Sequence, residues 1–334
     1  MRTLWLGHSK HSLGFRRWLV AASLALMNSI AGAQAVGNGI ELVVPTAAQG
    51  STDLLARLVA EGLGRRGFGD VRVRNMPGRS GTLAAAHVAA AAPDGRTLLV
   101  ATPSSHGIAS AFEARLPFDP LASFTPIVRF AAAPYLLVVN AGGPSTMGQF
   151  VEQARSANGG WRYASTGTGG PHHLVAEYYF QQTGLKLRHI PASGGAAALG
   201  QLVDGQVEVM LPAAVLALPR VRSGQLKALA VTGKQRIKAL PGVPTFSEAG
   251  IPIEAESWYG LMAPAGLPQA QATALADAVL ATLTEPAVEQ RLAELAVERT
   301  AERGQDFAAV IAGEVARWSR LVRDLGIRAD DKAD

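Results

Sequence analysis

The chain has 334 residues, of which 48% are apolar, a length and content that can bury the cores of two domains. It has no cysteine, which excludes disulfides, thiol catalysis and cysteine-based zinc sites. Residues 1–33 hold four of the 31 basic residues and none of the 26 acidic ones, so the remainder is nearly neutral and shows no nucleic-acid-binding footprint.

The first 33 residues have the pattern of an export signal. Two arginines at 16–17 precede an apolar run at 18–27, and residues 31–33 form the small-x-small pattern that a signal peptidase cleaves. We expect a signal peptide at 1–33, cleavage after Ala33 and a periplasmic protein. A membrane anchor is disfavoured, because a run of about ten residues is roughly half of what a bilayer requires. Sec and twin-arginine export both stay open, with Sec preferred.

From residue 40 onward, apolar runs alternate with helical spacing, which is typical of parallel α/β sheets. The run at 40–45 predicts a buried strand. Leucines at helical spacing predict a helix at 52–63, with Ser51 or Thr52 as N-cap. The series continues with a strand at 71–74, a helix at 82–92 and a strand at 97–102.

A second series of strands and helices follows. Strands are expected at 135–140, 161–165, 187–191, 207–211 and 226–232, with helices at 145–157, 171–183, 195–204 and 214–223. The final third is expected to be helical. Its last helix carries an apolar stripe that predicts core packing: Phe307, Val310, Ile311, Val315, Trp318, Leu321, Val322 and Leu325.

Several motifs occur in the order typical of one family of exported proteins. They are Asn-Met-Pro-Gly-Arg-Ser-Gly (75–81), Ala-Pro-Asp-Gly-Arg-Thr-Leu-Leu (92–99), Tyr-Ala-Ser-Thr-Gly-Thr-Gly (163–169), Leu-Pro-Gly-Val-Pro-Thr-Phe-Ser-Glu-Ala-Gly (240–250) and Ser-Trp-Tyr-Gly-Leu-Met-Ala-Pro-Ala-Gly-Leu-Pro (257–268). The chain resembles the Bug-type (tripartite tricarboxylate transporter) family of periplasmic solute-binding proteins. The resemblance covers nearly all of the chain beyond the signal peptide.

The resemblance decides between two fold classes, since composition alone also allows one large doubly wound domain. It implies an α/β, two-lobed periplasmic binding protein (type II-like), each lobe a mostly parallel sheet flanked by helices. Crossings near 132–134 and 252–256 would give a discontinuous lobe 1, residues 34–133 and 252–334, and a lobe 2, residues 134–251. The implied ligand is a small organic acid, and the implied partners are membrane permease subunits. We expect a monomer that does not anchor directly to the membrane.

Four loops rich in Gly, Ser and Thr each follow a strand and open a helix: loop 1 (46–53), loop 2 (103–107), loop 3 (165–173) and loop 4 (192–196). Helix N-termini offer unpaired N–H groups that favour a carboxylate, and no loop contains Arg or Lys. By resemblance, loop 1 holds one carboxylate of the ligand. The candidate ligand-binding residues are Thr46, Ala48, Gln49 and Gly50; Ser104 and Ser105; Ser165, Gly167, Thr168 and Gly169; and Ser193, Gly194 and Gly195.

Structural roles compete with ligand binding in these loops. Asp53 suits an ordinary capped turn, and Ser104 and Ser105 are equally well explained as caps of the following helix. The adjacent His172 and His173 suggest a metal site at first sight. Consecutive helical side chains point about 100° apart, however, so we expect no metal.

Enzyme motifs are missing from the sequence after residue 33. It has no Gly-x-Ser-x-Gly elbow, no Walker lysine and no His-Glu-x-x-His, so we expect no catalytic residues and no cofactor. A Ser–His–Asp triad can be assembled on paper only, from Ser165, His173 and Asp204. Two alternatives stay open: a periplasmic sensor-input protein, and, with less support, a hydrolase or lyase acting on a small carboxylate.

Departures from the family pattern bear on the ligand. Thr46 and Ala192 stand where aromatics are common, Ser193 replaces a basic residue and Pro212 replaces an aspartate. These changes weaken polar recognition of the far end of the ligand. We predict one firmly held carboxylate and a less polar remainder, as in a substituted aromatic or short aliphatic acid. If waters replace the missing side chains, a standard dicarboxylate binds instead, which is nearly as strong an alternative.

Overall fold

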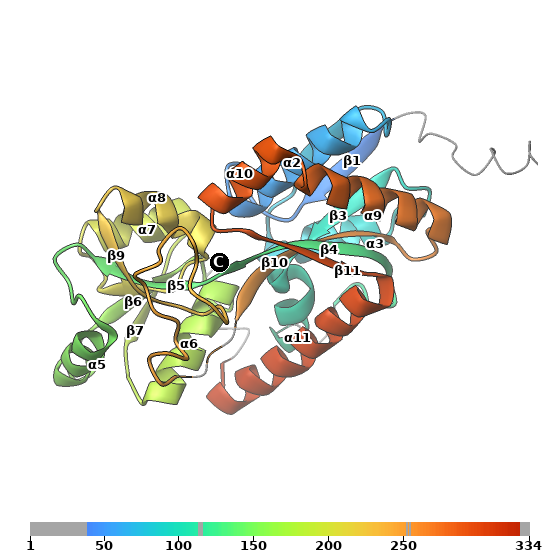
Figure 1. The fold of residues 1–334 in the computed structure, drawn as a ribbon. Helices are drawn as coiled ribbons and strands as arrows, with labels where there is room; N and C mark the ends of the chain where they lie inside the picture. Colours follow the sequence, from blue (N-terminus) through green and yellow to red (C-terminus); the bar gives the residue numbers. More distant parts are fainter. Residues whose placement is uncertain (1–38, 113–115, 252, 254, 328–334) are drawn as a thin grey trace, which may run out of the picture.

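Two mixed β-sheets, each flanked by helices, make up the computed structural model (Figure 1), which describes residues 39–112, 116–251, 253 and 255–327. The signal peptide predicted at 1–33 lies outside the described residues. The first sheet has the order β11 (Glu298–Arg303), β4 (Phe124–Pro134), β10 (Glu256–Pro264), β3 (Thr97–Ala101), β1 (Ile40–Val44) and β2 (Val71–Asn75). The second has the order β7 (Arg188–Pro191), β6 (Arg162–Ser165), β8 (Val209–Met210), β5 (Leu136–Asn140) and β9 (Leu226–Val231).

Both sheets are mixed, parallel on one side and antiparallel on the other, and not mostly parallel as expected. Strands β3, β1 and β2 are parallel, as are β7, β6 and β8. Strands β10, β4 and β11 pair antiparallel in the first sheet, and β5 pairs antiparallel with β8 and β9 in the second. The parallel parts matter for function, because their carboxyl ends gather the loops that open helices at one edge of the sheet.

The chain passes from the first sheet to the second through Tyr135, which lies between β4 and β5. It returns between β9 and β10, and β10 pairs with β4 so that Glu256 lies opposite Pro134. The buried Thr232 joins the two passages: its hydroxyl accepts from the Tyr135 N–H at 2.9 Å and donates to the Ala255 carbonyl at 2.6 Å. The lobe boundaries given above stay a proposal.

Helices cover both faces of each sheet. On the first sheet, α2 (Ser51–Arg65), α9 (Gln269–Leu283) and α10 (Pro286–Glu294) lie on one side, and α11 (Gly304–Leu325) lies on the other (Figure 1). On the second, α7 (Gly195–Val203) and α8 (Ala214–Arg222) lie opposite α5 (Met147–Ser156) and α6 (Pro171–Thr183). The shorter α3 (Thr82–Ala89) shares a buried cluster with α11. No helix of the described part is long and apolar enough to cross a membrane.

Close packing between neighbouring elements requires glycine at two positions. A Cβ on Gly260 of β10 would lie 2.1 Å from Cζ of Phe307, and one on Gly62 of α2 would lie 2.1 Å from the Thr282 side chain of α9. Phe307 belongs to the predicted α11 stripe, and five of the stripe residues are buried: Phe307, Ile311, Trp318, Leu321 and Val322. The prediction that this stripe is core packing is confirmed.

The structure corrects several sequence-based expectations. The final third is not wholly helical, because β10 and β11 lie in it. The N-cap of α2 is Gly50 rather than Ser51 or Thr52. The predicted strand at 207–211 shrinks to β8, since only Val209 and Met210 pair with neighbouring strands. Strand β4 was not predicted at all.

Candidate functional site

Loop 1 is held in shape by a buried carboxylate. Asp53 accepts hydrogen bonds from the Gln49 N–H at 2.9 Å, from Asn75 at 3.0 Å and from Arg57 at 3.0 Å. Burial alone would raise the pKa of Asp53, but these hydrogen bonds and the Arg57 charge lower it overall. The side chain is therefore engaged within the protein, and Gln49, with φ of 65°, exposes its own side chain at the loop surface.

The Thr46 hydroxyl of loop 1 is unsatisfied in the described structure and could bond to a ligand. Its Oγ1 is buried and has no hydrogen-bond partner among the described residues. Gly50, the N-cap of α2, has no side-chain cap, and a Cβ there would lie 3.9 Å from the same oxygen. Because a buried hydroxyl without a partner is costly, this position favours an incoming hydrogen-bonding group.

A short turn outside the four predicted loops lies against Pro45, which precedes loop 1, and against loop 2. It is the 3₁₀ turn η1 (Arg79–Gly81), and a Cβ on Gly81 would lie 2.9 Å from Pro45 and 3.1 Å from the Ser105 side chain. Arg79 and Ser80 both have positive φ, a conformation that side chains rarely adopt. The sequence motif at 75–81 could have placed this turn in the site, because it begins at the end of β2, at the sheet edge where loops 1 and 2 also lie.

Loop 2 forms a π-helical turn, η2 (Pro103–Ile108), capped by its own side chains. Ser105 is fully buried, and its hydroxyl accepts from the Thr102 N–H at 3.1 Å and contacts His106 Nδ1 at 2.9 Å. Burial lowers the pKa of His106 to about 3, so this imidazole is neutral. The geometry favours the capping role of Ser105, whereas Ser104 is partly exposed.

Loop 3 is organised by two histidines that point to different partners. His172 Nδ1 lies 2.7 Å from the Thr166 hydroxyl, and the Gly169 N–H donates to His173 Nδ1 at 2.9 Å. His173 stacks face to face on His189, with ring centroids 4.0 Å apart. The part of the chain that the structure describes contains no cluster of His, Asp or Glu able to hold a metal.

The buried Ser165 hydroxyl stabilises loop 3 through hydrogen bonds. It donates to the Gly167 carbonyl at 3.0 Å, accepts from the Gly167 N–H at 3.1 Å and lies 2.7 Å from His189 Nε2. Burial lowers the pKa of His189 and of His172 to about 4, so both rings are neutral. Gly167 has φ of 127°, and nothing lies within 4 Å of a Cβ placed there, so its backbone borders open space.

Loop 4 lies beside loop 3 because β7 and β6 are parallel neighbours. The Ala192 N–H donates to the Ser165 carbonyl at 3.0 Å. Gly194 borders open space, while Gly195 is packed so closely that a Cβ would lie 2.7 Å from the Leu216 side chain. Ser193 is exposed, and Thr168 of loop 3 is partly exposed.

Aromatic side chains on the crossing segments connect loops of the two sheets. The Tyr259 hydroxyl of β10 accepts from the Ser257 hydroxyl at 3.3 Å. The side chain of Ser51, the first residue of α2, opposes the rise in the pKa of Tyr259 that burial causes. Ser257 likewise opposes the rise in the pKa of Tyr135 that burial causes, and the rings of Tyr135 and His172 pack edge to face with centroids 5.7 Å apart. Cα atoms of α6 and η2 also approach within 8 Å, so the helix that loop 3 opens lies near loop 2.

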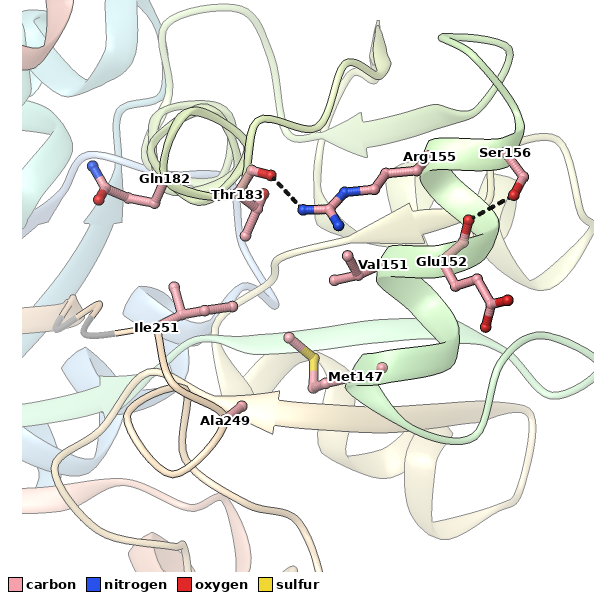
Figure 2. A pocket seen from close by; sticks show the side chains of 10 residues that line it. Met147, Val151, Glu152, Arg155, Ser156, Gln182, Thr183, Ala249 and Ile251 are labelled. Atoms are coloured by element: carbon pink, nitrogen blue, oxygen red, sulfur yellow. Dashed lines mark hydrogen bonds between the residues drawn. The ribbon is translucent and has the colours of Figure 1, made fainter.

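A separate cavity of about 640 Å³ lies elsewhere, between α5, the end of α6 and residues 249–251 (Figure 2). Its lining includes Met147, Val151, Arg155, Thr183, Ala249 and Ile251. None of the predicted ligand-binding residues lines it. The four loops and this cavity are therefore two distinct features.

Comparison with known proteins places the chain in a family. Residues 55–327 match the family model described as "Tripartite tricarboxylate transporter family receptor". The chain belongs to this family. It is also 29% identical over 328 residues to a protein encoded in the tcbD-tcbE intergenic region of Pseudomonas sp. (strain P51), covering 96% of this chain and 97% of that one.

Solved structures of the same type carry carboxylates. An R. palustris protein solved with adipate is 31% identical, with a TM-score of 0.82, covering 87% of this chain and 99% of that one. MatC from Rhodopseudomonas palustris with bound malate is 32% identical, with a TM-score of 0.76, covering 86% and 99%. The fold of this receptor-family chain is thus that of two-lobed periplasmic solute-binding proteins, as the sequence predicted, and not that of an enzyme family.

Proposed function

We propose that this protein captures a small organic carboxylate between its two lobes, among loops 1 to 4, and closes on it about the two crossings. The support is the meeting of loops from both sheets: the Ser51–Tyr259–Ser257–Tyr135–His172 connection runs from the N-terminus of α2 to the N-terminus of α6. Both helix ends carry partial positive charge and free N–H groups, which stabilise an anion without a basic side chain.

The proposed contacts divide between the lobes. Thr46 and the backbone of Ala48 to Gly50 hold one carboxylate from the first sheet, with Ser104 and the newly included η1 nearby. Gly167 and Gly194, which border open space, bring the backbones of loops 3 and 4 to the ligand from the second sheet. Closure brings the two sets together, so the liganded form is stabilised by contacts that the open form lacks.

The ligand class follows from what these loops do and do not offer. Neutral donors are present for one carboxylate, and His172 and Tyr135 give the adjoining space a partly aromatic wall. We propose an acid whose remainder is largely apolar. The similar protein solved with adipate supports an apolar middle, and the one with malate supports the competing, more polar dicarboxylate.

The proposal also includes where the protein acts and which membrane protein receives its ligand. The export signal at 1–33 and the family support a monomeric periplasmic protein that delivers its ligand to a permease of the tripartite tricarboxylate type. A sensor-input role uses the same capture step, so the two differ only in the membrane partner that the closed form recognises.

Calorimetry on the processed protein tests ligand capture, using a panel of mono-, di- and tricarboxylates that includes adipate and malate. We expect binding to an acid with one carboxylate and an apolar body, and a smaller radius of gyration by solution scattering when it is bound. Submicromolar binding of citrate, malate or glutamate with no response to monocarboxylates would overturn the ligand class. An unchanged scattering profile with a bound ligand would overturn closure.

A further inference from the structure

The cavity between α5, the end of α6 and residues 249–251 has the size and lining of a small-molecule site. Its volume of about 640 Å³ falls within the roughly 300–1,000 Å³ usual for ligand pockets. Met147, Val151 and Ile251 provide apolar wall, and Arg155 lies at one end (Figure 2).

The walls are fixed by a cluster of buried rings, one from each wall. Phe150 of α5 lies 6.2 Å from Tyr179 of α6 between ring centroids, and Tyr179 lies 5.1 Å from Phe246. Phe246 anchors the third wall, because its carbonyl accepts the Ile251 N–H at 2.9 Å. A pocket whose walls are already held in place loses little conformational entropy when a ligand binds.

The charged groups at the pocket favour an anion at one end. Arg155 reaches from α5 towards α6 and donates to the Thr183 carbonyl at 3.3 Å. Glu152 also lines the cavity, but its carboxylate points away from the gap between α5 and α6 (Figure 2). No ion pair joins Arg155 to a carboxylate within the described residues, so most of its five donors stay available. The buried Tyr179 hydroxyl, without a described hydrogen-bond partner, lies within reach of the same positive charge.

We propose that this pocket is a second binding site, separate from the loops between the lobes, for an amphipathic monoanion: a carboxylate or sulfonate on an apolar body. The head group pairs with Arg155, and the body lies against Met147, Val151 and Ile251. The pairing is charge-assisted, and the apolar wall adds affinity in proportion to the area it covers. Neither contribution uses the loops of the proposed carboxylate site.

A fluorescence titration of the processed protein with 8-anilinonaphthalene-1-sulfonate, followed by displacement with decanoate, tests the proposal. Arg155→Gln is expected to weaken probe binding about tenfold, as the loss of one charge-assisted pair should. The matched control Arg188→Gln removes an exposed arginine of the same lobe away from the pocket, and should leave binding unchanged.

A second pair of variants shows whether weaker probe binding comes from the pocket or from loss of the folded structure. Val151→Glu puts a negative charge on the pocket wall and should weaken the probe, while Gln153→Glu, on an exposed position of the same helix, should not. Equal binding by the wild type and Arg155→Gln would overturn the proposal. So would loss of the probe in Gly169→Asp, which would place it among the loops. Carboxylate calorimetry on Arg155→Gln, expected to be unchanged, keeps this outcome separate from the proposed function.

Discussion

Tyr135 and Thr232 are joined by reciprocal hydrogen bonds. The Tyr135 N–H donates to the Thr232 hydroxyl at 2.9 Å, and the Thr232 N–H donates to the Tyr135 carbonyl at 3.0 Å. The same hydroxyl donates to Ala255, so one buried side chain connects the chain segments that pass between the sheets. These segments are where the proposed closure has to bend, and Thr232 fixes their spacing.

Thr232→Val should therefore destabilise the protein. The isosteric change leaves the Tyr135 N–H and the Ala255 carbonyl without their partner in a buried place, at a cost of about 1–3 kcal/mol for each group. Urea unfolding measures the loss. Thr284→Val is the control, because its exposed hydroxyl bonds only to Ala281 one turn earlier, and it should change stability by less than about 0.5 kcal/mol. Equal stability of both variants would contradict the role given to Thr232.

Gly169→Asp and Gly194→Asp should each abolish carboxylate binding. Both put a negative charge and a side chain where the backbone of loops 3 and 4 is proposed to meet the ligand. Gly224→Asp is the control for Gly194→Asp, since both glycines have positive φ and nothing lies within 4 Å of either Cβ position. Calorimetry with the best acid of the panel decides. Undiminished binding in both loop variants would move the site elsewhere.

Gly260→Ala should destabilise the first sheet. A methyl group there would overlap the buried Phe307 ring, and overpacking of this kind costs about 1–3 kcal/mol. Gly313→Ala provides the contrast within α11, because its Cβ position is open and alanine is the better helix former by about 0.5–1 kcal/mol. Thermal and urea unfolding should thus shift in opposite directions for the two variants.

Stability should fall as the pH drops from about 6.5 towards 4. Burial lowers the pKa of His172 and His189 to about 4 in the folded state, so between these values the unfolded chain binds more protons. His106 adds to the same effect, because burial lowers its pKa to about 3. The stabilisation is complete above pH 6.5 and is lost as the pH falls through 4 towards 3. His189→Gln should flatten this slope in urea unfolding, because it removes one of these buried rings. Parallel curves for the wild type and this variant would contradict this account.

The processed protein should begin at Gln34. The cleavage pattern at 31–33 is short and local, so an intact mass of the periplasmic fraction measures it directly. Full-length chain retained in the membrane fraction would show that the segment acts as an anchor instead.

Helices were predicted well because their signals are local. The range 171–183 matches α6, which starts at a proline and ends before a left-handed glycine. Strand β4 was missed because its partners β10 and β11 pair with it from more than a hundred residues away. Such pairing leaves no periodic trace in the sequence of either strand.

The candidate site was predictable as a set of loops but not as a set of side-chain roles. Ser105 and Ser165 look like free hydroxyls in the sequence, yet the structure gives both several protein partners. Tyr135 and Tyr259 look like ordinary strand residues, and only the fold brings them beside the loop residues His172 and Ser51. The partners of Ser105 are local and Ser165 also bonds to His189 on the next strand, so the backbone geometry decides which groups meet, and sequence spacing does not encode it.

The pairing of Pro134 with Glu256 makes the entire second sheet, with its helices, an insertion into a would-be β-hairpin. Directly opposed Cα atoms of antiparallel strands lie only about 4.5–5.5 Å apart, a gap that a two-residue turn spans. Joining β4 to β10 by such a turn would therefore yield a shorter gene product with an uninterrupted first sheet. Conversely, an unrelated domain whose termini lie close together could replace the second sheet at this junction, and the strand pairing of the first sheet would not change.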